Sequence, residues 1–254
     1  MPKTDCLKPT LILIHGAWHS AKCWDELRPL LEAQDIQCLC PELPGHGNNR
    51  FELTRISLKV YSSYISQLID KNNNIFLIGH SMAGILISLL AEQYPEKIQS
   101  LIYLSAYLPQ NKQSLFDLMA DHQQEHGLTP IESALEFSAD KRRCTLATAD
   151  IIPLFYNQCS ADRQQWALQH FQEQASLPLA TKPSLSDANF GSVHKNYIRC
   201  THDQIIPASQ YTMMLAAQPC QAVYELDADH SPFWSNPQAL SELIVKIVKK
   251  PGGY

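Results

Sequence analysis

Short apolar runs alternate along this chain with segments in which apolar residues recur at helical spacing. The apolar runs lie at residues 10–16, 36–43, 75–79, 100–109, 196–201 and 221–226. Helical patterns lie around residues 60–69, 85–90, 208–217 and 240–248. Strands joined by helices in this way pair in parallel and are covered on both faces. The alternation therefore predicts an α/β fold with a mostly parallel central sheet flanked by helices.

The middle of the chain, residues 110–190, breaks this alternation because it is polar and helix-leaning, with weak strand signals. We interpret it as a helical cap inserted over the carboxyl edge of the sheet, where ligands bind in such folds. Residues 1–109 and 191–254 then form the core, and core and cap make up a single structural domain. A chain of 254 residues is long enough to bury a sizeable core in one such domain.

Charge and hydropathy argue against several kinds of partner. The formal net charge is −5 and no dense Lys/Arg cluster offsets it, so we expect no nucleic-acid partner. No apolar run approaches the length of a membrane span, and residues 1–10 lack the apolar core of a signal peptide. The eight cysteines are scattered without a C-x-x-C pair. This pattern suits reduced thiols in a cytoplasmic protein.

The most specific motif is the turn between the run at 75–79 and the helical pattern that follows it. It places Ser81 between Gly79 and Ala83, which matches G-x-S-x-G with alanine in the last position and Gly84 directly behind. Such a turn holds the serine in a strained conformation with its hydroxyl above the sheet. The alternative is an incidental serine in a glycine-rich turn. The strand before it and the helix after it favour a nucleophile.

A serine nucleophile requires a base, and the base requires an acid that orients it. Asp203 and His230 each directly follow a predicted strand, so both should emerge at the same sheet edge as Ser81. Asp227 and Asp229 are rivals for the acid. Both lie so close to His230 in sequence that they cannot easily approach its far ring nitrogen, and we therefore favour Asp203.

Acyl transfer also needs N–H donors for an oxyanion. The N–H of Met82 directly follows the nucleophile, and the N–H of Ala17 lies in the loop after the first strand, where Gly16 allows close approach. His15 and His80 adjoin these two loops. We interpret both histidines as scaffold residues that hold the loops by side-chain hydrogen bonds.

One motif points to a different chemistry. Residues 122–126 (HQQEH) fit the H-x-x-E-H pattern of one class of zinc proteases. The motif lies in the polar cap, Gly127 follows it at once, and nothing indicates a third ligand. We therefore expect a solvated helix end, and neither a metal nor another cofactor.

With these residues considered, the chain resembles the α/β-hydrolase superfamily. Within it, the chain is most similar to the plant methylesterase and hydroxynitrile lyase group, which includes the salicylate-binding methylesterase and polyneuridine aldehyde esterase. The similar stretches start at residues 15, 79, 190 and 227 and read HGAWHSAKCWDELRPLLEA, GHSMAG, FGSVHKNYIRCTHDQIIP and DADHSPFWSNPQAL. The resemblance implies a catalytic triad of Ser81, Asp203 and His230, with Ala17 and Met82 as oxyanion donors.

Two positions separate the esterases of this group from its lyases. The lyases have threonine where this chain has Gly16, and where this chain has Ser231 they have a lysine whose charge stabilises departing cyanide. Both differences favour the esterase branch. The stretch PELPGHG at 41–47 instead resembles bacterial α/β-hydrolases, which argues against a plant-hormone substrate.

Together these residues predict a serine carboxylesterase that hydrolyses small carboxylic esters, such as methyl or aryl esters, through an acyl-enzyme. The alternatives are a hydroxynitrile lyase that uses the same triad as a base, and a ligand-binding receptor of the same fold. Trp18, Phe233 and Trp234, with Gly16, are candidates for the pocket wall, although the three aromatic residues fit core packing equally well. Dimers are common in the resembling group, so a homodimer is an expectation by analogy, and the sequence itself leaves the oligomeric state open.

Overall fold

The computed structural model describes residues 8–249, so most of the segment examined for a signal peptide lies outside it. Six parallel strands form the central sheet in the order β2-β1-β3-β4-β8-β9. Their bounds are β1 Thr10–Ile14, β2 Gln37–Leu39, β3 Ile75–His80, β4 Ile98–Leu104, β8 His194–Cys200 and β9 Ala222–Leu226. The predicted α/β fold with a parallel central sheet is confirmed.

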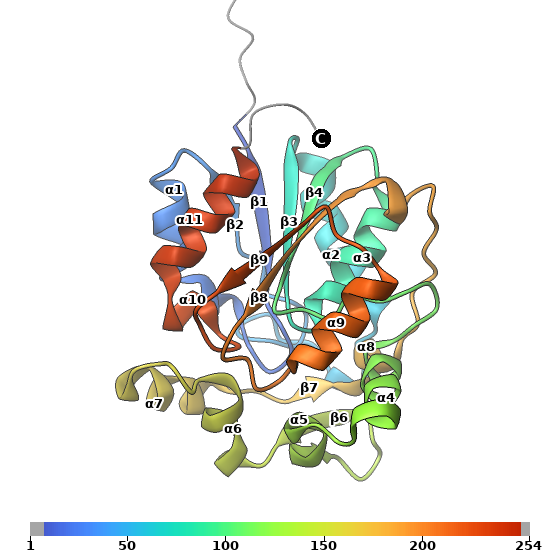
Figure 1. Cartoon of the computed structure of the whole chain (residues 1–254), viewed down its shortest axis with the longest axis vertical. Coiled ribbons are helices and arrows are strands. Elements are labelled where there is room, and N and C mark those ends of the chain that lie inside the picture. The colour runs from blue at the N-terminus through green and yellow to red at the C-terminus, as the bar shows by residue number, and fades with distance from the viewer. Residues whose placement is uncertain (1–7, 250–254) are drawn as a thin grey trace, which may run out of the picture.

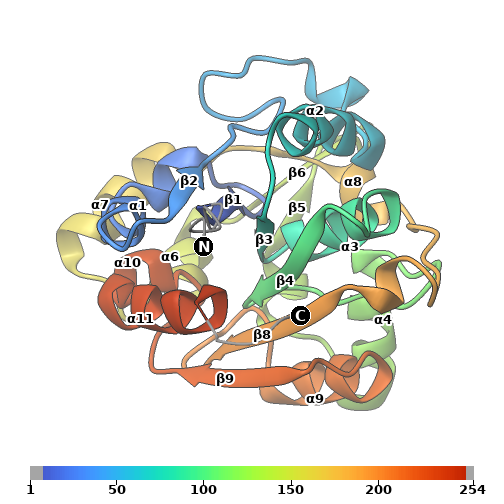
Figure 2. The same cartoon turned by 90° about the horizontal axis from the view of Figure 1, so that it is seen from above.

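Helices cover both faces of this sheet (Figures 1 and 2). One face carries α1 (Leu27–Glu32) and α11 (Pro237–Val248), and the other carries α2 (Leu58–Lys71), α3 (Ala83–Gln93) and α9 (Ala208–Ala217). Short helices in the connections are η1 (Ala21–Trp24), η2 (Leu53–Arg55), η3 (Phe190–Ser192) and α10 (Pro232–Ser235). Every residue of β1 and β3 is buried, as expected for central strands of a sheet with helices on both faces.

The last helix follows its sequence signals closely. The side chain of Asn236 accepts a hydrogen bond from the N–H of Ala239 at 3.4 Å, and Pro237 occupies the first helical position. Leu240 and Ile244 on one face are fully buried. The capping side chain of Asn236, the proline at the first position and the apolar stripe together determine where α11 begins and which side it buries.

Two strands are shorter than the apolar runs that predicted them. The strand expected at 36–43 is β2, Gln37–Leu39, because Pro41 lacks the N–H that would extend the pairing of this edge strand. The strand expected at 100–109 is β4, which ends at Leu104. Ser105 then turns the chain with a φ of 42°, a left-handed conformation that cannot continue a strand.

The cap lies below the carboxyl ends of the strands in Figure 1. Its helices are α4 (Leu115–His126), α5 (Pro130–Ala134), α6 (Thr148–Phe155), α7 (Ala161–His170) and α8 (Ser176–Ala180). It also contains a three-stranded antiparallel sheet, β5 (Leu135–Phe137), β6 (Arg143–Leu146) and β7 (Gln174–Ala175), beyond the helical cap that we expected. These strands are only two to four residues long, which is too short to produce a continuous apolar run in the sequence.

Two features bear on the protein's surroundings. Within the described range, none of the helices combines the length and hydropathy needed to cross a bilayer. The seven cysteines in that range are all free thiols.

Gly84, in the first turn of α3, allows that helix to approach the loop after β4. A Cβ at this position would lie 2.1 Å from the carbonyl oxygen of Tyr107 and 3.1 Å from the Cβ of Ala106. The nearer neighbour is main chain, which cannot swing aside as the tip of a side chain can. The absence of a side chain at Gly84 therefore sets the distance between α3 and this loop.

We predict that Gly84→Ala destabilises the protein by about 1–3 kcal/mol, because overpacking forces the loop and helix apart. Urea denaturation measures the change in the free energy of unfolding. Gly191→Ala is the matched control, since its new Cβ would have its nearest neighbour at 3.4 Å. Equal stability of the two variants would contradict the prediction.

Candidate active site

Ser81 occupies the turn between β3 and α3 with a backbone φ of 54°, which is strained for a residue with a side chain. The loop after β4 holds this conformation. The N–H of Ser81 donates to the carbonyl oxygens of Leu104 and Ser105 at 3.3 and 3.2 Å, and its own carbonyl accepts from the N–H of Tyr107 at 3.1 Å. The turn thus has the strained backbone that the motif predicts.

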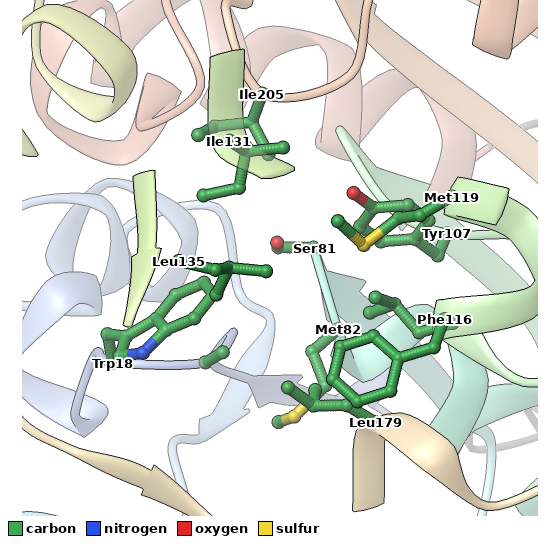
Figure 3. Close-up of a pocket in the computed structure, with 12 residues that line it drawn as sticks. Trp18, Ser81, Met82, Tyr107, Phe116, Met119, Ile131, Leu135, Leu179 and Ile205 are labelled. Atoms are coloured by element: carbon green, nitrogen blue, oxygen red, sulfur yellow. The ribbon is translucent and has the colours of Figure 1, made fainter. Parts of the chain in front are cut away.

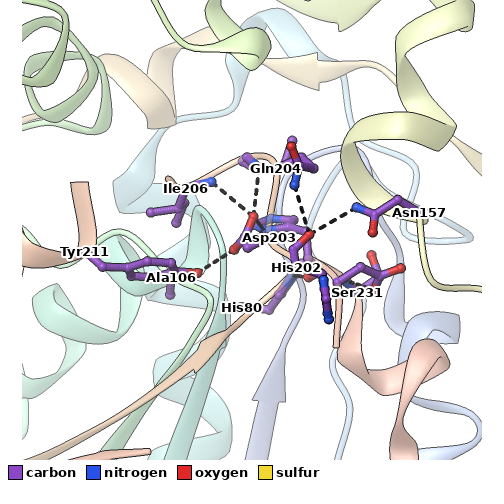
Figure 4. A network of polar contacts seen from close by, with 12 residues as sticks. His80, Ala106, Asn157, His202, Asp203, Gln204, Ile206, Tyr211 and Ser231 are labelled. Carbon is purple, nitrogen blue, oxygen red and sulfur yellow. Dashed lines mark hydrogen bonds and ion pairs between the residues drawn. The ribbon is translucent and has the colours of Figure 1, made fainter. Parts of the chain in front are cut away.

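His230 lies in the loop after β9 and is fully buried. It faces the carboxylate of Asp203, which lies in the loop after β8. Its Nδ1 lies 2.9 Å from both oxygens of that carboxylate, so Nδ1 donates and Nε2 is left as the acceptor nitrogen. Asp203 also accepts from the N–H groups of Ile205 (2.8 Å) and Ile206 (3.1 Å) and from the hydroxyl of Tyr211 (Figure 4). These donors fix the orientation of the carboxylate.

The two rival acids have other partners. Asp229 accepts from the N–H of Ser231 at 2.9 Å, at the start of the next helix. Asp227 pairs at the surface with His202, whose Nε2 lies 2.9 Å from its Oδ1. Among the acids considered from the sequence, Asp203 is therefore the one whose carboxylate hydrogen-bonds to the imidazole of His230.

Ser81, the third member of the predicted triad, is not hydrogen-bonded to His230. Nε2 of His230 is buried and has no hydrogen-bond partner within residues 8–249. Ser81 lines the pocket in Figure 3, and the expected hydrogen bond between its hydroxyl and Nε2 is not formed. Such bonds are often long before substrate is bound. The arrangement leaves one acceptor nitrogen without a competing donor, in the same site as the serine.

The loop after β1 lies directly against the nucleophile turn. A Cβ at Gly16 would be 2.9 Å from the Cβ of Ser81 and 2.8 Å from Nδ1 of His80, so only glycine allows this approach. Ala17 and Met82 line the same pocket as Ser81, and neither N–H has a backbone partner among the described residues. Two such N–H groups can stabilise a developing oxyanion.

His15 and His80 both form hydrogen bonds to main chain. Nε2 of His15 accepts from the N–H of Leu43 at 3.2 Å, and its Nδ1 donates to the carbonyl of Gly16 at 2.9 Å. Nε2 of His80 donates to the carbonyl of His230 at 2.8 Å. Burial holds the pKa of both imidazoles well below the usual value, so both remain neutral.

His19 is a further buried histidine at the site that we did not predict. Its Nδ1 donates to the carbonyl of Ala17 at 2.9 Å, and its Nε2 accepts from the hydroxyl of Tyr156 at 2.9 Å. Burial lowers its pKa to about 4. A neutral His19 therefore connects the cap, through Tyr156, to the loop that carries Ala17.

An apolar pocket opens beside Ser81, between the sheet edge and the cap (Figure 3). The core contributes Ala17, Trp18, Met82, Tyr107 and Ile205, and the cap region contributes Leu115, Phe116, Met119, Ile131, Leu135 and Leu179. The indole N–H of Trp18 donates to the carbonyl of Cys144 in the cap at 3.1 Å. About half of the pocket wall therefore comes from the segment with the weakest sequence signals.

Phe233 and Trp234 do not line this pocket, and their prediction as wall residues is wrong. Phe233 is fully buried, with ring centroids 5.0 Å from His80 and 5.1 Å from Trp24. Trp234 packs against Tyr156 at 5.5 Å. The physical reason is that α10 packs on η1 and α11, which directs Phe233 into the core and Trp234 against Tyr156 of the cap.

The HQQEH motif ends α4, but it is not simply a solvated helix end. His122 is buried and its Nε2 lies 2.7 Å from the hydroxyl oxygen of Ser209 on α9, whereas His126 is exposed. No group of three His, Cys, Asp or Glu side chains within residues 8–249 is placed to hold a metal ion. His122 instead joins the cap helix to the core.

Several residues of the site escaped the sequence analysis. Tyr211 lies eight residues after Asp203, in a helix whose pattern gave no sign that one hydroxyl turns back to the acid. His19 stands within the stretch HGAWHS that resembles the family, which was a usable signal. The cap residues Leu115 and Met119 share one face of α4 by their spacing, but the sequence alone could not say what that face covers.

Comparison with known proteins agrees with this fold. Residues 11–243 match the family model described as "Alpha/beta hydrolase family", and the chain therefore belongs to that family.

The chain is similar to plant methylesterases. It is 30% identical to a chloroplastic Arabidopsis thaliana protein named as a candidate methylesterase (methylesterase 11), over 94% of this chain and 63% of that protein. It spans 56% of two further chloroplastic proteins of this kind. Methylesterase 1 of the same plant is 27% identical, over 96% of this chain and 97% of that protein. The expected resemblance to the methylesterase group is confirmed.

A solved structure of a pyrethroid hydrolase from Sphingobium faniae JZ-2 is also similar. It superposes with a TM-score of 0.86 at 26% identity, and the match covers 96% of this chain and 98% of that structure. Fold and cap therefore match a bacterial protein as well as plant relatives.

We predict that Asp203→Asn lowers kcat for ester hydrolysis by a factor on the order of 10²–10⁴, because the amide no longer selects the tautomer that leaves Nε2 free to accept a proton. Steady-state kinetics at neutral pH measure the loss. Asp227→Asn is the matched control and should change kcat less than about twofold, since the carboxylate of Asp227 pairs at the surface with His202. A larger loss in the control would reassign the acid.

We predict that stability falls as the pH drops from about 6.5 towards 4. Burial lowers the pKa of His46 to about 4, as it does for His19. In the unfolded chain these two histidines take up protons near pH 6.5, and in the folded chain they do so only near pH 4. They therefore do not change the free energy of unfolding above about pH 6.5 and lower it as the pH falls below that value. Each such histidine steepens the fall by up to about 1.4 kcal/mol per pH unit.

Urea unfolding between about pH 7.5 and 4.5 tests this dependence. His46→Gln should reduce the slope of the unfolding free energy against pH by up to about 1.4 kcal/mol per pH unit, which corresponds to one proton. His126→Gln, at the surface, is the control and should leave the slope unchanged. An unchanged slope in His46→Gln would refute the assignment.

Proposed function

We propose that this protein is a carboxylic ester hydrolase in which Ser81 is the nucleophile, His230 the general base and Asp203 the acid that orients the base. The observation that carries the proposal is the buried Asp203–His230 pair, which leaves Nε2 as the acceptor nitrogen in the site of a strained serine. Strain at a non-glycine residue and a buried imidazole nitrogen without a partner both cost free energy, and catalysis is a reason to retain them.

In the proposed reaction, Oγ of Ser81 attacks the ester carbonyl carbon while its proton moves to Nε2 of His230. The N–H groups of Ala17 and Met82 hold the oxyanion, each contributing a factor on the order of 10²–10³ in rate. The tetrahedral intermediate collapses, and His230 returns the proton to the departing alcohol. Water, activated by the same imidazole, then cleaves the acyl-enzyme and restores the Ser81 hydroxyl.

The relatives and the pocket support small, largely apolar esters as substrates, including methyl and aryl esters. Similar proteins are named methylesterases and pyrethroid hydrolase. The pocket wall beside Ser81 is almost entirely apolar. No cation lines it, so a carboxylate elsewhere on the substrate would lack a partner there.

Two residues argue against the lyase alternative. A threonine at position 16 would not fit without rearrangement, because even a Cβ there approaches Ser81 and His80 to within 3 Å (2.9 and 2.8 Å). Ser231, at the position of the lyase lysine, is buried and carries no charge to stabilise cyanide. The chain therefore lacks both features that distinguish the lyases.

We predict that Ser81→Ala lowers the hydrolysis of p-nitrophenyl acetate by about 10⁴–10⁶-fold, because no other hydroxyl replaces the nucleophile. Absorbance of released p-nitrophenol measures the rate. Ser66→Ala, in α2 and bonded to the carbonyl of Ser62, is the matched control and should retain full activity. Turnover retained by Ser81→Ala would refute the mechanism.

A panel of methyl and aryl esters, assayed beside mandelonitrile, separates the esterase from its alternatives. Cyanide release that exceeds ester cleavage would establish the lyase. Saturable ligand binding without turnover of any ester would favour a receptor.

A further inference from the structure

Tyr107 brings a phenol group into the wall of the pocket beside Ser81. The residue is only 3% exposed, it lines the pocket, and its hydroxyl forms no hydrogen bond within residues 8–249. In Figure 3 its ring lies beside Met119, with the oxygen at the open centre of the pocket. Because this hydroxyl faces the pocket and no described residue pairs with it, it is available to a ligand.

The rest of the wall offers no competing polar side chain. Apart from Ser81, the other lining residues are apolar, with the exception of Trp18. The indole N–H of Trp18 is already used by the carbonyl of Cys144. Besides Ser81 and the N–H groups of Ala17 and Met82, which are assigned to the oxyanion, the Tyr107 hydroxyl is therefore the polar group of this lining that is left to recognise a ligand.

The position of Tyr107 is tied to the nucleophile. Its N–H donates to the carbonyl of Ser81 at 3.1 Å, and its own carbonyl lies against Gly84, where even a Cβ would come within 2.1 Å. The main chain of Tyr107 is thus fixed relative to Ser81, and the burial of its ring limits how far the hydroxyl can move. Recognition by such a group depends on position as well as on chemistry.

The surroundings also indicate the charge of the group that Tyr107 meets. Burial, and secondarily the carboxylates of Asp203 and Glu132, hold the pKa of Tyr107 well above its usual value. The phenol therefore stays protonated at working pH and can donate a hydrogen bond. Among the described residues no cationic side chain lines the pocket, so we expect the acceptor to be a neutral oxygen.

We propose that Tyr107 is a specificity-determining residue whose hydroxyl donates a hydrogen bond to a neutral oxygen on the substrate, away from the reacting carbonyl. The substrate class is then an otherwise apolar ester that carries one hydroxyl, ether or keto oxygen. This inference rests on the proposed ester hydrolysis and deepens it. The oxygen belongs either to the acyl group or to the alcohol, and the experiment below has one arm for each.

The acyl arm compares methyl benzoate with its ortho, meta and para hydroxy and methoxy derivatives, and p-nitrophenyl valerate with the levulinate. The alcohol arm compares phenyl acetate with its hydroxy and methoxy derivatives. We expect the wild-type protein to prefer an oxygenated member of one arm by about 3–10-fold in kcat/KM, as one neutral hydrogen bond allows. Tyr107→Phe should lose that preference, so that kcat/KM for the oxygenated ester falls about 3–10-fold relative to kcat/KM for the parent ester.

Tyr224→Phe, on β9, is the matched control, and thermal unfolding of each variant reports on folding. Equal loss on parent and oxygenated esters in Tyr107→Phe would mean a purely structural role and would overturn the inference. The absence of any preference in both arms of the wild-type protein would overturn it without use of the variant. If hydrolysis proved independent of Ser81, the proposed function itself would fail, which is a separate outcome.

Discussion

The close approach of three loops at Ser81 is the constraint on which the site depends. The loop after β4 holds the left-handed backbone of Ser81 by hydrogen bonds, and the loop after β1 reaches it because Gly16 has no side chain. Gly84 does the same for α3. A Cβ at Gly16 would meet the side chains of His80 and Ser81, and a Cβ at Gly84 would meet the main chain of Tyr107. Parallel strands make this convergence possible, since their carboxyl ends meet at one edge of the sheet.

The second organising feature is the hydrogen bonding between cap and core. Buried, neutral side chains carry it, and they connect the loops of the site to cap segments distant in sequence. The connections are Trp18 to Cys144, His19 to Tyr156, His46 to Gln174 and His122 to Ser209. Because the cap also supplies about half of the pocket wall, its position on the core sets both the shape of the pocket and the placement of Ala17.

The choice of the acid illustrates how sequence and structure divide the work. Sequence spacing favoured Asp203 over its neighbours because it comes from a separate loop, and the observed partner is the one expected. The carboxylate meets Nδ1, however, which is the ring nitrogen nearer the main chain and not the far nitrogen on which that choice was argued. The same reasoning could not find Tyr211, whose hydroxyl also meets Asp203. That contact depends on how α9 is rotated, and packing decides the rotation. Phe233 and Trp234 were misplaced for the same reason, since the direction of α10 is a tertiary property.

The sequence itself determines the order of strands and helices, because that order depends on local periodicity. It also determines the turn at Ser81, which depends on glycines that lack a side chain, and the start of α11, where Asn236 lies close in sequence to its hydrogen-bond partner. The lining of the pocket, the unpaired phenol of Tyr107 and the short antiparallel sheet of the cap were decided only by the tertiary structure. They arise from contacts between segments far apart in the chain, and no local pattern of residues encodes which surfaces will meet.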